Sequence, residues 1–232
     1  MRTYRLMKIL RHLPNALTCG NLLSGCIGII YTIHYSATYA PWFVWAACVF
    51  DFLDGFVARA LKVSSPIGKE LDSLADVVSF GVLPSVMLYE MIDIISSSEI
   101  LPYLAFSIAI FSALRLARFN VDEKQKDSFT GLPVPADALF LTSLIYLTPP
   151  FDVFISTDWL LILIIAVFSY LLVSPWELFA LKFKNFSWAD NKVRFTFLAI
   201  SVLLLGLLQA AAIPFIILLY VAMSLLTRWV RI

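Results

Sequence analysis

Cysteine, histidine and charged residues are all scarce in this chain of 232 residues. The three cysteines, Cys19, Cys26 and Cys48, are odd in number, lie in apolar stretches and lack the spacing of a metal site. We therefore expect no disulfide framework and interpret them as small core residues. Charged residues make up 14% of the chain, whereas 61% of it is hydrophobic and the mean hydropathy is +0.88. This composition excludes an ordinary soluble domain and indicates a polytopic membrane protein.

Eight apolar runs are long enough to cross a bilayer. They cover residues 14–34, 41–60, 70–95, 100–119, 134–150, 158–175, 193–210 and 212–229. Only Gln209 and Pro214 separate the last two runs. We expect an all-α fold, a polytopic transmembrane helical bundle of about eight spans. Residues 13–184 would form the main membrane domain, and residues 185–232 a C-terminal helical pair of the same domain.

The 17 Lys and Arg residues predict which side of the membrane each loop occupies. If residue 1 lies in the cytoplasm and the spans alternate, all of these cations fall on the cytoplasmic side, and the outer loops carry only acids such as Asp93 and Asp152. We therefore expect both termini in the cytoplasm. Because no targeting extension precedes the first span, a prokaryotic plasma membrane is the simplest location.

Residues 1–12 form a basic arm. On a helical wheel its cationic side chains gather on one side and its apolar side chains on the other, which fits a short amphipathic helix lying on an anionic leaflet. The alternative is a basic flank that only orients the first span.

Four carboxylates lie within or beside some of the most apolar sequence. They occur in the two stretches Asp51-Phe-Leu-Asp54-Gly55-Phe-Val-Ala58-Arg59 and Gly68-Lys-Glu-Leu-Asp72-Ser-Leu-Ala-Asp76. Hydrocarbon tolerates such groups only where they face one another, an ion or water. If both stretches are helical, the acids and the small residues of each share one face, since residues three, four and seven apart are neighbours.

This arrangement predicts a pocket. Asp51 and Asp76 would lie roughly 12 Å below Arg59 and Gly68, at about 1.5 Å per helical residue. Clustered carboxylates are hard oxygen ligands suited to Mg²⁺ or Mn²⁺, and whether one ion or two would bind stays open. The alternative is two helices with polar packing faces.

The complete pattern, D-x2-D-G-x2-A-R-x8-G-x3-D-x3-D, resembles the CDP-alcohol phosphatidyltransferases. These are integral membrane enzymes that move a phosphatidyl group from CDP-diacylglycerol to an alcohol and release CMP. The resemblance implies a metal site, catalytic carboxylates, contacts to the CDP moiety and a homodimer. The metal ligands would be Asp51, Asp54, Asp72 and Asp76; the catalytic residues Asp72 and Asp76, with Asp76 as general base; and the CDP contacts Gly55, Ala58, Gly68 and Arg59, the last as phosphate partner.

Further stretches resemble the branch of this family that uses L-serine as acceptor. They are Ser79-Phe80-Gly81, the run Ala113-Leu-Arg115-Leu-Ala-Arg118-Phe-Asn120, and Phe129-Thr-Gly131-Leu-Pro133-Val-Pro135. In addition, Val77 follows the fourth Asp, where relatives that use glycerol phosphate or inositol phosphate commonly carry Lys or Arg. The sequence disfavours the covalent route of the phospholipase-D-like serine synthases, because neither His12 nor His34 belongs to a His-x-Lys motif.

Five more polar residues are candidates for substrate contacts. Asn15, Thr18 and Asn21, near the start of the first span, would line the nucleotide pocket or pack helices through hydrogen bonds. Arg115 and Arg118 would clamp a carboxylate or phosphate, or serve as topology anchors. Two other functions stay open: a transferase of the same family with glycerol 3-phosphate, an inositol species or an amino alcohol as acceptor, and a cation or lipid transporter.

Overall fold

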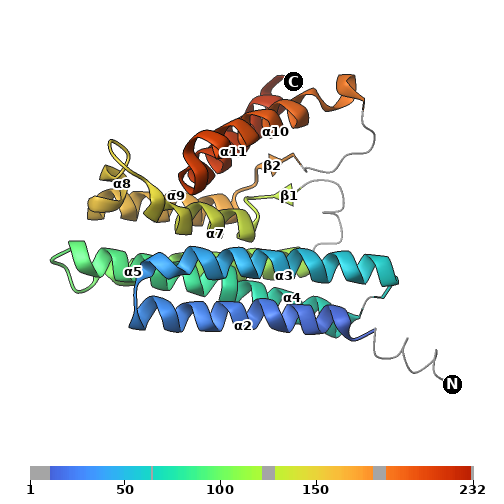
Figure 1. Cartoon of the computed structure of the whole chain (residues 1–232), viewed down its shortest axis with the longest axis horizontal. Helices are drawn as coiled ribbons and strands as arrows, with labels where there is room; N and C mark the ends of the chain where they lie inside the picture. Colours follow the sequence, from blue (N-terminus) through green and yellow to red (C-terminus); the bar gives the residue numbers. More distant parts are fainter. Residues whose placement is uncertain (1–10, 64, 122–128, 180–186, 231–232) are drawn as a thin grey trace.

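The structure, a computed structural model, describes residues 11–63, 65–121, 129–179 and 187–230. Most of the arm expected at residues 1–12 lies outside these residues. The described chain is almost wholly helical (Figure 1). Its one strand pair is β1 (Phe129–Thr130) against β2 (Glu177–Leu178), antiparallel, with Phe129 opposite Leu178.

The first helices form a tight antiparallel pair that carries half of the acidic motif. Helix α2 (Leu13–His34) leads through a short 3-10 turn, η1 (Ala37–Tyr39), into α3 (Ala40–Leu61). Each of the two helices has a proline in its first turn, where the missing N–H costs no hydrogen bond. α3 ends at Lys62, whose left-handed backbone (φ 53°) closes the helix.

The second half of the motif lies on a continuous helical rod. Ser65 caps α4 (Pro66–Asp76) by accepting the backbone N–H of Gly68 at 3.0 Å. α4 passes through a π-helical turn, η2 (Val77–Val82), directly into α5 (Leu83–Ile95). Asp76 is therefore the last residue of α4 and stands at the start of the π turn.

The remaining elements complete the bundle. They are η3 (Leu101–Phe106), α6 (Ser107–Val121), α7 (Val134–Ser143), η4 (Leu144–Tyr146), α8 (Val153–Ser156), α9 (Asp158–Val173), α10 (Trp188–Leu208), η5 (Gln209–Ala211) and α11 (Ala212–Val230). In the view of Figure 1, α2 to α5 form one layer, α7 to α9 lie above it, and α10 with α11 lie on top.

Two hydrophobic clusters hold these layers together. One joins α3, η2, α5 and α7 through residues such as Val44, Phe80 and Val134. The other joins α5, α6, α7 and α9 through residues such as Leu88 and Leu141. Both clusters include residues of α7, so this short helix connects the layer that carries the acidic motif to the rest of the bundle.

The expected membrane bundle is confirmed, since each of the eight apolar runs contains a helix. Within the part of the chain that the structure describes, four helical stretches are long and apolar enough to cross a membrane: α2, Pro66–Ile95, Leu101–Val121 and Asn191–Thr227. Val134–Tyr146 and α9 are shorter apolar helices. The run at 134–150 leaves helical structure after Tyr146, close to Pro149 and Pro150, which remove backbone donors.

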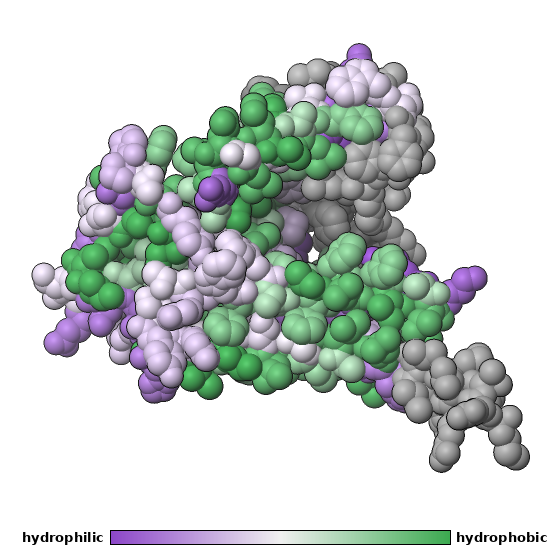
Figure 2. Space-filling view, in the orientation of Figure 1, coloured by the Kyte–Doolittle hydropathy of each residue, from purple (hydrophilic) through white to green (hydrophobic). Residues whose placement is uncertain are grey.

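The surface is largely apolar, as a bilayer requires. Figure 2 shows apolar side chains over much of the face formed by α2 and α3, and over α10 and α11. The expectation that the cysteines are core residues was wrong for two of them: Cys19 and Cys26 are exposed on α2, and Cys48 is half-buried. In a membrane protein a small apolar residue gains as much on a lipid-facing surface as in the core, so apolar neighbours in sequence do not predict burial.

Candidate active site

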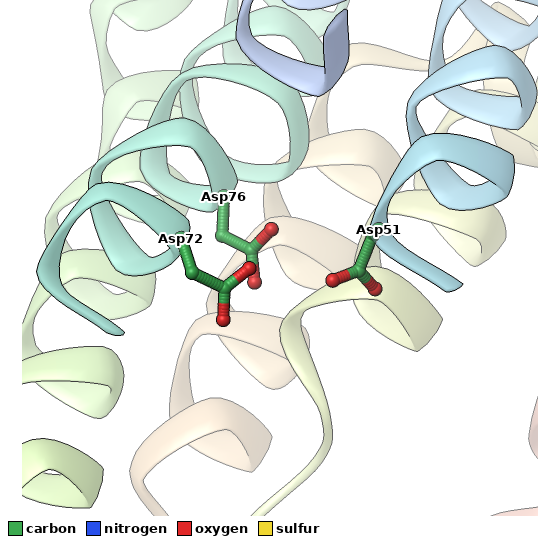
Figure 3. A group of neighbouring side chains, drawn as sticks. All are labelled: Asp51, Asp72 and Asp76. Carbon is green, nitrogen blue, oxygen red and sulfur yellow. The ribbon is translucent and has the colours of Figure 1, made fainter. Parts of the chain in front are cut away.

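Three carboxylates converge between α3 and α4. Asp51, Asp72 and Asp76 each bring one oxygen within 4.8 Å of the others, and Figure 3 shows Asp51 reaching from its helix toward the other two. Asp76 is buried, and Oδ1 of Asp72 is buried without a hydrogen-bond partner. Like charges this close repel one another, so a cation would stabilise the group strongly. An orphaned carboxylate oxygen among hard oxygen donors fits a divalent metal ion.

Asp54 is the fourth carboxylate of the motif; it interacts electrostatically with Asp72, and both side chains line the neighbouring cavity. It is 6% exposed, and its Oδ2 accepts a hydrogen bond from the hydroxyl of Thr18 at 2.6 Å. The same hydroxyl lies 3.1 Å from the carbonyl oxygen of Pro14. Asp54 is therefore held by α2, whereas the other three carboxylates are grouped by α3 and α4.

Asp76 is also oriented by α2. Nδ2 of Asn21 donates to Oδ1 of Asp76 at 3.0 Å, and the hydroxyl of Ser79 donates to the carbonyl of Asn21 at 2.9 Å. Thr18 and Asn21 are three residues apart and share one face of α2. The structure thus places two of the polar residues singled out in the first span directly on motif carboxylates, where they orient them.

The π turn that follows Asp76 packs closely against α2. A Cβ added to Gly25 would overlap the hydroxyl of Ser79 and lie 2.8 Å from its Cα. Only glycine allows the two backbones to approach this closely. π turns occur often at functional sites, and this one fixes the end of α4 that carries Asp76.

A cavity of about 510 Å³ opens beside the carboxylates. Its lining comes from the start of α2, the end of α3 and the start of α4: Arg11, His12, Pro14, Asn15, Thr18, Asp54, Gly55, Ala58, Val63, Ser65, Ile67, Gly68, Lys69 and Asp72. This volume is typical of a pocket for a cofactor-sized ligand. This cavity thus brings together the candidates Asn15, Gly55, Ala58 and Gly68 with Thr18. The carboxylates of Asp54 and Asp72 belong to the same lining.

Small residues and cations shape the cavity. A Cβ on Gly68 would lie 3.0 Å from Oδ1 of Asn15, so glycine keeps this wall open. Arg59 lies over Gly55, with Nη1 3.3 Å from the position of a Cβ there. Arg11 and Lys69 add positive charge to the lining, and the sequence analysis did not select either for this site.

Arg115 and Arg118 lie at a second, smaller cavity of about 40 Å³. Its other lining residues are Phe119, Thr130, Leu172, Val173 and Ser174, at the ends of α6 and α9 and on β1. Nε of Arg115 is buried and has no hydrogen-bond partner. The guanidinium of Arg115 also interacts electrostatically with the carboxylate of Asp76. Arg115 is therefore close to the carboxylate group, and neither arginine is among the residues that line the larger cavity.

The sequence analysis missed two residues near these cavities. Asp137, in the first turn of α7, is fully buried, although a lone acid inside an apolar run is a signal for function. Asn120 ties the end of α6 to α4: its Nδ2 donates to the hydroxyl of Ser73 at 2.9 Å, and its carbonyl accepts from Nζ of Lys69 at 3.0 Å. Both contacts join segments far apart in sequence.

An acidic group between two helices of an apolar bundle, beside a ligand-sized cavity, indicates an integral membrane protein with a candidate binding site. The chain belongs to the CDP-alcohol phosphatidyltransferase family, because residues 11–227 match that family. The resemblance inferred from the acidic motif is therefore confirmed.

Several curated relatives carry the name CDP-diacylglycerol–serine O-phosphatidyltransferase. The protein of Bacillus subtilis is 32% identical over 181 residues, 76% of this chain and 92% of the relative. That of Helicobacter pylori strain J99 is 40% identical over 130 residues, 55% of this chain and 54% of the relative. That of Methanocaldococcus jannaschii is 39% identical over 121 residues, 52% of this chain and 54% of the relative. The match thus spans about half the length of the last two proteins.

Proposed function

We propose that this protein transfers the phosphatidyl group of CDP-diacylglycerol to the hydroxyl of L-serine and releases CMP, as a step of phospholipid biosynthesis. The observation that carries the proposal is the group of Asp51, Asp72 and Asp76, of which Asp72 also lines the cavity of about 510 Å³. Family membership supports the reaction class, and the names of the relatives support serine as the acceptor.

The carboxylates would hold one or two divalent cations, Mg²⁺ or Mn²⁺. Asp51, Asp72 and Asp76 supply the grouped oxygens, and Asp54 is the fourth proposed ligand. A metal ion held by these residues would supply positive charge for the diphosphate of the substrate and for the leaving oxygen. The hydrogen bonds from Thr18 and Asn21 leave Asp54 and Asp76 with a fixed direction before any ligand arrives.

The CDP moiety would occupy the larger cavity. Gly55, Ala58 and Gly68 line this cavity with little or no side chain, which would let the diphosphate approach the helix backbones. Arg59 is the proposed phosphate partner, and Asn15 lies next to Gly68 on the facing wall. The acyl chains would leave toward the lipid, which the apolar surface of the bundle contacts.

The serine hydroxyl attacks the phosphorus that carries the diacylglycerol group. The bond from this phosphorus to the oxygen shared with CMP breaks, and CMP departs with that oxygen. Asp76 accepts the proton of the hydroxyl, a role that suits a buried carboxylate held by Asn21. Arg115 and Arg118, at the small cavity, would bind the carboxylate of serine.

The protein would work in a prokaryotic plasma membrane with the site and both termini on the cytoplasmic side. The larger cavity lies where cationic residues such as Arg11, Lys62 and Lys69 gather, as the positive-inside rule requires of a cytoplasmic end. Family resemblance also favours a homodimer.

The test is CMP release by the purified protein in detergent. CDP-diacylglycerol is supplied with Mg²⁺ or Mn²⁺ and with serine, glycerol 3-phosphate, inositol, inositol phosphate or an amino alcohol as acceptor. We expect release with serine, loss of release on chelation, and a fall of at least about 100-fold in Asp76→Asn, because the variant removes a proposed base and ligand. The matched control is Asp93→Asn, an exposed acid of α5, which we expect to stay active.

The possible results distinguish between the candidate acceptors and between a transferase and a transporter. Release with another acceptor keeps the family reaction and overturns serine. No release with any acceptor from a folded, metal-loaded sample overturns the transferase and favours a cation or lipid transporter. Full activity in Asp76→Asn overturns the proposed base.

A further inference from the structure

Asp137 is the most unusual ionisable residue outside the motif. Its side chain is fully buried, and neither carboxylate oxygen has a hydrogen-bond partner among the described residues. A buried acid without a partner destabilises a fold by several kcal/mol, and such residues inside membrane proteins are usually retained for a function. The proposed transfer reaction as described above does not use Asp137.

The nearest opposite charge is also incompletely bonded. The carboxylate of Asp137 interacts electrostatically with the guanidinium of Arg115, yet Nε of Arg115 is buried and, like both oxygens of Asp137, makes no hydrogen bond. Two buried opposite charges would gain most by direct contact. Because the two groups do not bond to each other, Nε of Arg115 stays available as a donor to a third group. The oxygens of Asp137 stay available to the same group as acceptors.

The backbone ties the start of α7, the helix that carries Asp137, to one wall of the small cavity. Gly131, with φ of 76°, turns the chain between β1 and α7, and its N–H donates to the carbonyl of Trp176 at 2.9 Å. The N–H of Leu132 donates to the carbonyl of Leu171, also at 2.9 Å. The start of α7 is therefore attached to the segment from Leu171 to Trp176, which supplies Leu172, Val173 and Ser174 to the cavity that Arg115 lines.

Arg115 lies within electrostatic reach of two acids, Asp137 and Asp76. Asp76 is the proposed acceptor of the hydroxyl proton. A small molecule bound at Arg115 by its carboxylate would thus have a hydroxyl-activating group within reach and a second, unused carboxylate close by. An α-amino acid with a side-chain hydroxyl offers the three matching groups: a carboxylate, a hydroxyl and an ammonium.

We propose that Asp137 binds the ammonium group of the acceptor, so that Asp137 and Arg115 together form a site for a zwitterionic hydroxy-amino acid. This assignment rests on the proposed transfer to serine and names the residue that selects an amine-bearing acceptor. An acceptor without the ammonium group leaves the buried carboxylate of Asp137 unpaired, and polar sites of this kind discriminate strongly against analogues that lack the matching group.

The experiment compares two acceptors in two proteins. L-serine and 3-hydroxypropionate both carry a carboxylate and a primary hydroxyl, and only serine carries the ammonium. In the wild-type protein we expect kcat/KM for 3-hydroxypropionate to be at least about 100-fold below that for serine. In Asp137→Asn we expect kcat/KM for serine to fall about 100-fold, mainly through KM, and the preference for serine to shrink to less than about tenfold.

Two controls test whether the effect is specific to Asp137 and to the acceptor. Asp93→Asn removes an exposed acid far along α5 and should keep the full preference for serine. The KM for CDP-diacylglycerol and the metal concentration for half activity should change less than about threefold in Asp137→Asn, since the larger cavity is intact.

Three outcomes would overturn the assignment. Wild-type protein that uses 3-hydroxypropionate as well as serine has no ammonium site, whatever the variant does. An equal loss for both acceptors in Asp137→Asn would mean that the residue only supports Arg115 or the fold. Wild-type protein that releases no CMP with serine overturns the proposed function itself, which distinguishes that failure from a failure at Asp137.

Discussion

Thr18 connects the first helix to the acidic motif through a single hydroxyl. Its hydrogen bond to Oδ2 of Asp54 is 2.6 Å long and buried. Bonds from a neutral donor to an ionised carboxylate stabilise by about 1.5–3 kcal/mol. Thr18→Val keeps the shape of the side chain and removes this donor, so Asp54 would lose its fixed direction at the edge of the cavity.

We expect Thr18→Val to raise the metal concentration for half activity by about tenfold, which corresponds to about 1.4 kcal/mol. The matched control is Thr32→Val, in the same helix. The hydroxyl of Thr32 donates to the carbonyl of Gly28 at 2.8 Å, within α2 and far from the carboxylates. Equal shifts in the two variants would show that the effect comes from α2 as a whole and would contradict the role given to Thr18.

The site residues were predictable from sequence to the extent that they share a helix face. Asp51, Asp72 and Asp76 were expected to converge, because spacings of three and four place acids on one face and hydrocarbon forces them together. The hydrogen bond that Thr18 donates to Asp54 was not predicted. It depends on how closely α2 approaches α3, and that distance is set by side-chain packing across sequence separations that a helical pattern does not encode.

At the scale of whole elements, the packing of α2 against the π turn fixes the position of Asn21 relative to Asp76. Gly25 lies one turn beyond Asn21 on α2, and Ser79 of η2 packs against it. The apolar runs predicted both helices. The π turn itself had no sequence signal, since one extra residue in a turn leaves the hydrophobic pattern almost unchanged.

Gly25→Ala should disturb this packing. The new methyl group would meet the backbone at Cα of Ser79 at 2.8 Å, which a rotamer change does not relieve. We expect a loss of about 1–3 kcal/mol in stability and a lower kcat, because the shift moves Asn21 away from Asp76.

Gly206→Ala in α10 is the matched control, as nothing lies within 4 Å of a Cβ there. It should leave thermal stability in detergent equal or slightly higher, since alanine favours a helix by about 0.5–1 kcal/mol over glycine. A melting temperature for Gly25→Ala as high as that of the control would show that the backbones of α2 and η2 can move apart without a loss of stability, and would contradict this prediction.

At the scale of the whole molecule, the buried share of the apolar helices differs between the centre of the bundle and the C-terminal pair. Only 11% of the most apolar window in Asn191–Thr227 is buried, against 61% of that in Pro66–Ile95. α10 and α11 therefore present most of their apolar surface outward, whereas α4, η2 and α5 form the centre of the bundle. Hydropathy alone could not rank these runs, because lipid and a protein core accept the same side chains.

The orientation of the bundle is the last prediction, and it concerns every loop at once. With Cys19, Cys26 and Cys48 replaced by alanine, Thr38→Cys would place a thiol in the exposed connection between α2 and α3, and Lys192→Cys would place one near the start of α10. In intact cells we expect a membrane-impermeant maleimide to label Thr38→Cys, and to label Lys192→Cys only after permeabilisation, because cationic segments stay on the cytoplasmic side. The reverse pattern would put the acidic cavity on the outer face, where CDP-diacylglycerol and serine made in the cytoplasm would not reach it, and would contradict the proposed function together with the topology.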